Sequence, residues 1–265
     1  MKKYSFGTRI YLSLMFLVLY LPIFYLIFYS FNKGTTMNHF EGMSLIHYRE
    51  LLEDTRLLGN VVNTLIIALL SAVIATEIGT FGAMAIYFMK NRFYRHWLLN
   101  LNNILIVTPD VMIGASFLIL LTRVVVIKLG FWSVLVSHVA FNIPIVVLMV
   151  LPRLEEMNDN LLLVAKDLGA NVHQILVQVI LPSVQKGIFS GFLMALTYSF
   201  DDFAVTFFVT GNGFSTLALD IYSRARRGIS LEINALSTLI FGVSLAFVIG
   251  YYFIQVRQIK DEKKG

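Results

Sequence analysis

Four acidic side chains lie inside long apolar stretches of this sequence, where charged groups are rare and costly. They are Glu77, Asp110 and the adjacent pair Asp201 and Asp202. A charged group at the centre of a membrane-spanning helix costs about 2.5–3.5 kcal/mol on insertion scales, so such residues usually face the bundle interior or a water-filled cavity. Because all four are carboxylates, they favour a pathway for a cation.

The aspartate pair has the most informative surroundings. Adjacent residues of a regular helix point about 100° apart, so Asp201 and Asp202 cannot share one face. Asp202 falls in line with Tyr198, Ser199 and Thr206, a polar stripe suited to lining a cavity. Asp201 is then expected to meet a partner subunit or to cap a local break in the helix. The alternative is that both aspartates lie in headgroup water at the end of their stretch.

The other two acids leave more alternatives open. Asp110 follows Pro109, which frees a backbone carbonyl one turn earlier, and the two together suit a cavity wall. Asp110 has the alternative role of locking two helices through a hydrogen bond. Glu77 has no obvious basic partner in the sequence, so it is protonated and hydrogen-bonded, pairs with another subunit, or contacts the substrate.

Aromatic residues beside the acids are secondary candidates for the same pathway. Tyr198, Phe203 and Phe207 flank the aspartate pair, and aromatic faces attract cations. His138 is expected to be a packed polar residue rather than a ligand. We predict no metal site, and the absence of cysteine from the sequence excludes one built on thiolates.

The stretches that carry these residues are long enough to cross a bilayer. The composition is 57% hydrophobic and 14% charged, which is too apolar for the surface of a soluble protein. Apolar runs of about 20 residues are typical of membrane-spanning helices. Backbone groups left unpaired in lipid are costly, so we expect an all-α polytopic protein with six transmembrane helices. The six stretches are 10–32, 57–89, 96–122, 129–152, 187–209 and 233–256.

The distribution of Lys and Arg indicates an orientation. With the N-terminus inside, the inner connections carry 13 basic residues and the outer ones 8, by counting along the sequence. This excess predicts that both termini are cytoplasmic. No internal repeat or linker divides the chain, so we expect one transmembrane domain over 1–265, with a cytoplasmic insert at 153–186.

The insert has helical spacing of apolar residues on either side of Gly169. This pattern predicts two short helices joined by a turn at the glycine, with Pro182 ending the second helix.

The insert resembles the "EAA" loop of permease subunits of type I ABC importers. That pattern reads Glu-Ala-Ala, three residues, Gly, nine residues, Ile, one residue, Leu-Pro. Here Leu163 and Val164 replace the Glu and the first Ala, so a salt bridge through that Glu is in doubt. The resemblance implies contact with an ATPase through the insert residues Ala165, Lys166, Asp167, Gly169, Ala170, Val179, Leu181 and Pro182.

Further segments are similar to the PotC-like permeases of spermidine/putrescine transporters. They are residues 40–52, 129–147, 165–170, 199–211 and 232–240, in the expected order. The resemblance implies a MetI-like fold in the bacterial cytoplasmic membrane and the import of polyamines. Polyamines carry several ammonium groups separated by methylenes, which spaced carboxylates and aromatic faces suit.

The resemblance also implies partners. We expect a second homologous permease, two copies of a cytoplasmic ATPase, an extracytoplasmic substrate-binding protein and membrane lipid, but no nucleic acid. The sequence has no Walker A pattern, so ATP and Mg²⁺ are expected on the ATPase, and no cofactor is expected on this chain.

Three other functions stay open at this stage. The chain could import another small solute, since permeases for sulfate, molybdate, thiamine and iron share the loop, although four acids disfavour an oxyanion. A secondary transporter driven through Glu77 would need no ATPase. An intramembrane aspartyl protease would use Asp110 with Asp201 or Asp202, but the Gly-x-Gly-Asp pattern that is typical of such enzymes is absent.

Overall fold

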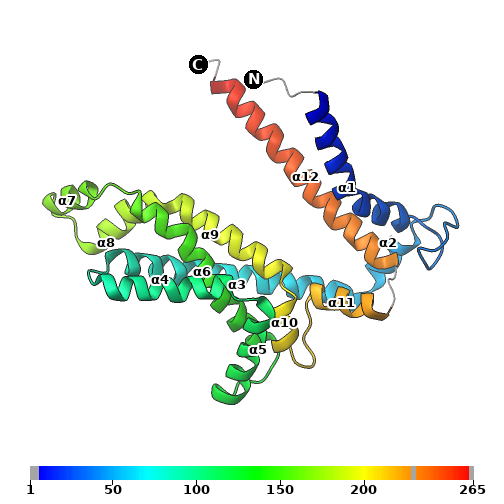
Figure 1. Ribbon diagram of the computed structural model, residues 1–265, viewed down its shortest axis with the longest axis horizontal. Helices are drawn as coiled ribbons and strands as arrows, with labels where there is room; N and C mark the ends of the chain where they lie inside the picture. The colour runs from blue at the N-terminus through cyan, green and yellow to red at the C-terminus, as the bar shows by residue number, and fades with distance from the viewer. Residues whose placement is uncertain (1–5, 228–230, 263–265) are drawn as a thin grey trace. The chain divides into compact units, whose positions relative to one another are not determined.

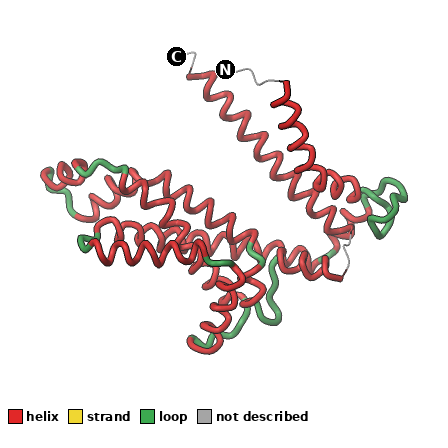
Figure 2. Tube along the Cα trace, viewed as in Figure 1, coloured by secondary structure: helices red, strands yellow, loops and turns green. Residues whose placement is uncertain are grey.

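The computed structural model describes residues 6–227 and 231–262. Every regular element within these ranges is a helix, which confirms the all-α prediction (Figures 1 and 2). The elements are α1 (Phe6–Ser30), α2 (Ile46–Glu53), α3 (Thr55–Phe88), α4 (Arg92–Val107), α5 (Asp110–Ile119), η1 (Leu120–Val124), α6 (Phe131–Glu155), α7 (Asn160–Asp167), α8 (Val172–Ile175), η2 (Leu176–Ile180), α9 (Leu181–Asp201), α10 (Ala204–Val209), α11 (Leu217–Arg227) and α12 (Leu231–Glu262), where η1 and η2 are π-helical.

The long helices match most of the predicted spans. Among the described residues, 4 helices are long and apolar enough to cross a membrane, or 5 if α4 and the helix after it form one bent span. Within α12, the segment Leu231–Ala246 is a shorter apolar helix. The structure thus supports a polytopic membrane protein, while the number six stays a prediction. Of the lysines counted for orientation, Lys2, Lys3, Lys263 and Lys264 lie outside the described residues.

The prediction of one continuous helix over 96–122 is wrong. The chain ends α4 at Val107 and restarts at Asp110, and the two helices are bent by 108°. Thr108 has an extended ψ of 132°, the conformation that a following proline favours. Pro109 has no N–H to continue the helix, so the bend places Asp110 in the first turn of α5.

The described residues form two compact units, and each is described by itself. One unit comprises the residues up to Leu58 and those from Ile221 onward, and the other is Gly59–Asp220. In the first unit, α12 packs against α1 and α2. Asn32 is fully buried there and orders the loop after α1: its amide donates to the carbonyls of Thr36 (3.1 Å) and His39 (2.9 Å), and its oxygen accepts from the Glu41 N–H (2.8 Å).

An ion cluster ties the start of α3 to α11 and α12 in this unit. Arg224 donates to Asp54 (2.6 Å) and Glu232 (3.0 Å), while Asp54 also accepts from the Leu57 N–H (2.9 Å) and so caps α3. Burial raises the pKa of Asp54, but the hydrogen bonds from Leu57 and Arg224 outweigh it, and the pKa lies below its ordinary value of 3.8.

Stability should therefore depend on the charge of Asp54 in acid. A carboxyl whose pKa is depressed by folding stabilises the native state above its unfolded-state pKa, and that stabilisation disappears as the pH falls through the folded-state value. We expect Asp54→Asn to lower stability by about 1 kcal/mol at pH 7, because asparagine can still cap α3 but removes the ion pair with Arg224. Thermal unfolding of the purified complex between pH 7 and pH 3 should show the two proteins converging below about pH 3.8. A constant difference down to pH 3 would contradict this.

The second unit is held by close packing of α3, α6 and α9 around small residues. A Cβ added at Gly79 of α3 would lie 2.6 Å from the Val146 side chain, and one added at Gly191 of α9 would lie 3.2 Å from it. Ala75 and Ala83, which share a face with Gly79, have no exposed surface. Small residues let helices approach closely in a membrane, and here they bring α9 against α6.

Two apolar cores result within this unit. One lies between α3, α6, α9 and the insert and includes Val146, Val150 and Leu154. The other lies between α3, α5, α6 and α10 and includes Ile113, Val134 and Val205. Since α6 and α3 contribute to both cores, they fix the position of α9 relative to α10.

The insert has helix on either side of a turn at Gly169, as the spacing predicts. Between α7 and α8, Gly169 adopts a φ of +79°, and the Ala170 N–H bonds to the Ala165 carbonyl (3.0 Å) while the Gly169 N–H bonds to that of Lys166 (2.9 Å). This pair of bonds is the Schellman motif that ends many helices, and it favours glycine at the residue with positive φ.

The prediction that Pro182 ends the second helix is wrong. Helix continues from Val172 to Asp201, with Pro182 in the first turn of α9. The wider π turn of η2 precedes the proline, with the Leu181 N–H bonded to the Leu176 carbonyl. The Ser183 hydroxyl donates to the Val179 carbonyl (2.6 Å), and the helix passes through the proline without a break.

Candidate functional site

The predicted fifth span is interrupted at the aspartate pair. Helix α9 ends at Asp201, Asp202 has an extended ψ of 123°, and α10 begins at Ala204. The carboxylate of Asp202 accepts from the N–H groups of Val205 (3.2 Å) and Thr206 (2.8 Å) and from the Thr206 hydroxyl (2.8 Å). The sequence predicts two alternative roles for Asp201, contact with a partner subunit or capping of a break; the break exists, but Asp202 is the residue that caps it.

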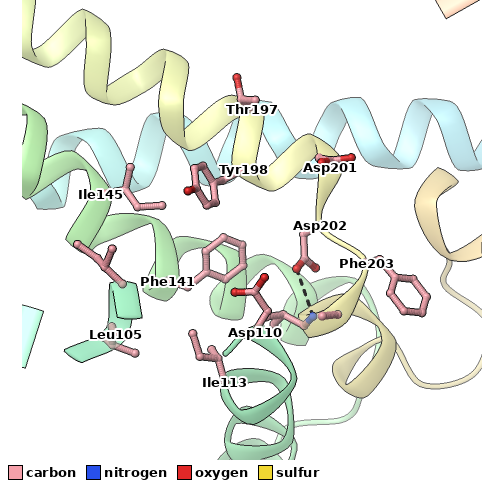
Figure 3. Close-up of a pocket in the computed structure, with 13 residues that line it drawn as sticks. Leu105, Asp110, Ile113, Phe141, Ile145, Thr197, Tyr198, Asp201, Asp202 and Phe203 are labelled. Carbon is pink, nitrogen blue, oxygen red and sulfur yellow. Dashed lines mark hydrogen bonds between the residues drawn. The ribbon is translucent and has the colours of Figure 1, made fainter. Parts of the chain in front are cut away.

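A pocket of about 400 Å³ lies beside this break (Figure 3). Asp201 stands at the end of α9, Asp202 in the break and Asp110 at the start of α5. The other lining residues are Leu105, Ile106, Ile113, Phe141, Ile145, Thr197, Tyr198, Phe203, Ala204 and Val205. Five of the sequence candidates, namely three acids and two aromatic residues, are thus brought together.

The three carboxylates of the pocket differ in whether their oxygens are free to bind a ligand. Asp110 and Asp201 are exposed, and neither has a hydrogen bond or ion pair within the described part of the chain. The side chain of Asp202 is 8% exposed, and its oxygens are occupied by the start of α10. No described residue lining the pocket is basic, so the pocket has a negative field that suits a cation.

Close packing of α5 on α10 places Asp110 in the pocket. A Cβ added at Gly114 would lie 2.7 Å from the Phe208 ring and 3.1 Å from the Ala204 carbonyl. Gly114 is one helical turn beyond Asp110, so this contact holds the first turn of α5 against the break.

The remaining candidates lie elsewhere. Thr206 and Ser199 are buried, so the expected polar stripe does not continue along a cavity wall, because the extended backbone at Asp202 ends the helical register. Phe207 is exposed and packs against Phe203 with the rings tilted and their centroids 5.6 Å apart. Glu77 is exposed in a separate, mostly apolar groove of about 580 Å³ between α3 and α9.

His138 is buried and hydrogen-bonded, as its sequence context predicts. Its Nδ1 lies 2.6 Å from the Ser199 hydroxyl and its Nε2 lies 2.9 Å from the Thr206 hydroxyl and 3.4 Å from the Asp202 carboxylate. The sequence analysis did not connect His138 with the aspartate pair. The available signal was a run of polar residues, Ser137, His138 and Asn142, in an otherwise apolar stretch.

The insert presents its predicted contact residues at the end of the second unit. Lys166, Asp167, Gly169 and Pro182 are exposed, whereas Ala165, Ala170, Val179 and Leu181 are half-buried. The apolar residues Leu168 and Val172, on either side of the turn, are 82% and 84% exposed. Such large exposed apolar side chains at a turn are typical of a surface that meets another protein.

Two polar contacts tie the root of the insert to the helices beside it. The Tyr87 hydroxyl at the end of α3 donates to Asp159 (2.6 Å), and Arg95 of α4 pairs with Glu155 at the end of α6 (2.5 Å). A displacement of the insert would therefore reach α3 and α4 as well as α9.

Sequence comparisons place the chain among transport proteins. Residues 78–261 match the family described as "Binding-protein-dependent transport system inner membrane component". The chain is 35% identical to the spermidine/putrescine transport system permease protein PotC of Escherichia coli K12, over 96% of this chain and 94% of that protein. It is 31% identical to the putrescine transport system permease protein PotI of the same strain, over 96% and 95%.

Solved structures share the fold. A chain of the inward-facing MetNI methionine ABC transporter superposes with a TM-score of 0.61 at 19% identity, over 81% of this chain and 97% of that one. A chain of a bacterial ABC transporter involved in the import of the acidic polysaccharide alginate gives a TM-score of 0.64 at 17% identity, over 96% and 99%. At these identities the likeness concerns the fold alone, which is that of ABC importer permeases.

Proposed function

We propose that this chain, which belongs to the family of binding-protein-dependent transport system inner membrane components, forms half of the pathway of a polyamine importer. The chain is a multi-pass ABC importer permease of the cytoplasmic membrane that works with an ATPase and a substrate-binding protein. It is a transport subunit and not an enzyme, so the intramembrane protease alternative is wrong.

The pocket beside the α9–α10 break carries the substrate proposal. Asp110 and Asp201 are unpaired within the described chain, exposed and lodged among apolar and aromatic residues. A polyamine matches this composition, since its ammonium groups meet carboxylates and its methylenes meet apolar side chains. Relatives named for spermidine and putrescine transport support the same substrate class.

Within the pocket we assign different roles to the candidates. Asp110 and Asp201 contact the substrate ammonium groups, and Tyr198 and Phe203 line the path of the methylenes. Asp202, held by Thr206, contributes negative charge and holds the break. An attractive but weak site favours release as well as entry, and the open pocket fits that requirement.

Glu77 takes a separate role in this proposal. It lies outside the pocket, in the groove between α3 and α9, so a homologous second permease is its proposed partner rather than the substrate. That second permease supplies the other half of the pathway, and lipid covers the remaining apolar helix faces.

The insert is the proposed contact with the ATPase, of which two copies serve the two permeases. The exposed turn at Gly169 with Leu168 and Val172 offers an apolar surface, and Ala165 and Leu181 anchor it to the core. When ATP and Mg²⁺ bind to the ATPase, they supply the energy for closure. The chain's own contribution is mechanical, because α8, η2 and α9 form one helix from the insert to Asp201.

The orientation follows from the same proposal. If the insert meets a cytoplasmic ATPase, both termini are cytoplasmic, as the 13 to 8 distribution of Lys and Arg predicts. The binding protein then delivers the cation from the opposite side.

ATP hydrolysis by the purified complex in lipid nanodiscs tests the function. The complex is supplied with its binding protein and with spermidine, putrescine or sulfate in separate arms. We expect stimulation by a polyamine and none by sulfate. Stimulation by sulfate alone would refute the substrate class, and substrate uptake in the absence of any ATPase would indicate a secondary transporter.

A further inference from the structure

His138 is buried among four helices next to the proposed pathway, yet it does not line the pocket. It is 0% exposed and sits in α6. Its ring joins Ser199, the third residue from the end of α9, to Thr206 in the first turn of α10. The imidazole thus lies across the break, with one hydrogen bond to each side of it.

The hydrogen atoms available decide which way these bonds run. The carboxylate of Asp202 only accepts, so the single hydroxyl proton of Thr206 goes to Asp202 (2.8 Å). The Thr206 oxygen must then accept from His138, which places a proton on Nε2 (2.9 Å). In the neutral ring Nδ1 carries no proton, so it accepts from the Ser199 hydroxyl (2.6 Å).

The chain of bonds extends one step further, to α3. The Ser71 hydroxyl lies 2.8 Å from Ser199, closer than the 3.2 Å to the Ala68 carbonyl, and it can donate to the Ser199 oxygen. One continuous series then runs from Ser71 through Ser199, His138 and Thr206 to Asp202. It links α3, α9, α6 and α10, and each hydroxyl or ring donates to the next member.

We propose that His138 is a positioning residue for transport: its Nε2 proton, passed on through Thr206, fixes the carboxylate of Asp202 and holds the α9–α10 break that presents Asp201 to the pocket. This inference rests on the proposed pathway. The inference goes beyond the proposed pathway, because it holds that a residue outside the pocket, without contact to the substrate, controls the geometry of the pocket carboxylates.

The proposal predicts different effects for the two amide substitutions at this position. His138→Gln places an amide N–H near the position of Nε2, so it can still donate to Thr206. His138→Asn places its amide near Nδ1, so it meets Ser199 but does not reach Thr206. His138→Phe keeps the ring volume and loses both bonds. Ser137→Ala is the matched control, because Ser137 is equally buried beside it and its hydroxyl has no partner among the described residues.

The first measurement is uptake of radiolabelled putrescine and spermidine by cells that carry the whole transporter. For His138→Phe and His138→Asn we expect the apparent KM to rise at least about 10-fold, because the pocket carboxylates are then no longer held in place for the substrate ammonium groups. His138→Gln should restore the KM to within about 3-fold of the parent, and Ser137→Ala should match the parent. A residue needed only for folding would lower the amount of protein in the membrane and leave the KM unchanged.

The second measurement does not depend on transport. Since the sequence has no cysteine, Phe203→Cys places a single thiol in the break for labelling by a water-soluble maleimide. His138→Phe should change its labelling rate at least about 3-fold in the assembled complex, and His138→Gln should return the rate to that of the single-cysteine parent.

The outcomes separate the two proposals. Unchanged KM and labelling in His138→Phe, or equal rescue by Asn and Gln, would overturn the role of His138. Failure of the parental complex to take up any polyamine would refute the proposed substrate, while the labelling experiment would still test whether His138 holds the break. If His138→Phe does not assemble, the comparison of the Asn and Gln variants decides.

Discussion

Replacing Asp110 and Asp201 together with asparagine is expected to reduce polyamine uptake by about 100-fold or more. Hydrogen bonds to charged groups contribute about 1.5–3 kcal/mol each, and 1.4 kcal/mol corresponds to a factor of ten. Each single substitution should therefore cost about 10-fold. Both side chains are exposed and unpaired within the described chain, so the substitutions should leave assembly intact.

Uptake and ATP hydrolysis together measure this effect. The double variant should assemble with its ATPase and lose the stimulation by polyamine. Glu53→Gln removes one negative charge, as each single substitution does, at a side chain that is 65% exposed in α2, outside the pocket, and it should behave as the parent. Full uptake by the double variant would show that the pocket beside the α9–α10 break is not the pathway.

The sequence predicts the helices and the acids of this site better than it predicts their geometry. Hydropathy identifies spans because lipid constrains the backbone to helices wherever the chain is apolar. It also singles out Asp110, Asp201 and Asp202, because charge inside an apolar stretch stands out in any register. The extended residues at Thr108 and Asp202 end helices within two of these spans, and hydropathy averages hide such breaks.

Tertiary contacts account for the rest. Asp201 and Asp202 are chemically identical neighbours, and no local pattern says which one caps the break. Asp202 does so because Thr206 and His138 lie beside it, and His138 comes from a different helix. Glu77 also lies within an apolar stretch, but its position on α3 places it in a groove that is separate from the pocket. Such choices depend on packing between helices, which one sequence does not display.

The turn at Gly169 offers the second large effect, this time on coupling rather than on the pathway. Replacing Gly169 with valine is expected to reduce ATPase co-purification and uptake at least about 10-fold. The residue has a φ of +79°. This left-handed backbone conformation costs residues with a Cβ about 1–2 kcal/mol, and β-branched residues more. No atom lies within 4 Å of an added Cβ, so the effect arises from the backbone conformation and not from a clash.

Asparagine at the same position separates these causes. Asn tolerates the left-handed conformation, so Gly169→Asn should keep the turn and nearly all of the coupling, although its side chain is larger than that of alanine. Because the insert lies at the end of its unit and Gly169 is exposed, neither substitution should prevent membrane insertion. If valine and asparagine reduce co-purification equally, the added side chain itself obstructs the ATPase. If neither substitution reduces co-purification, the insert is not the contact with the ATPase. A loss with valine alone would show that the shape of this one turn determines whether α9 follows the ATPase.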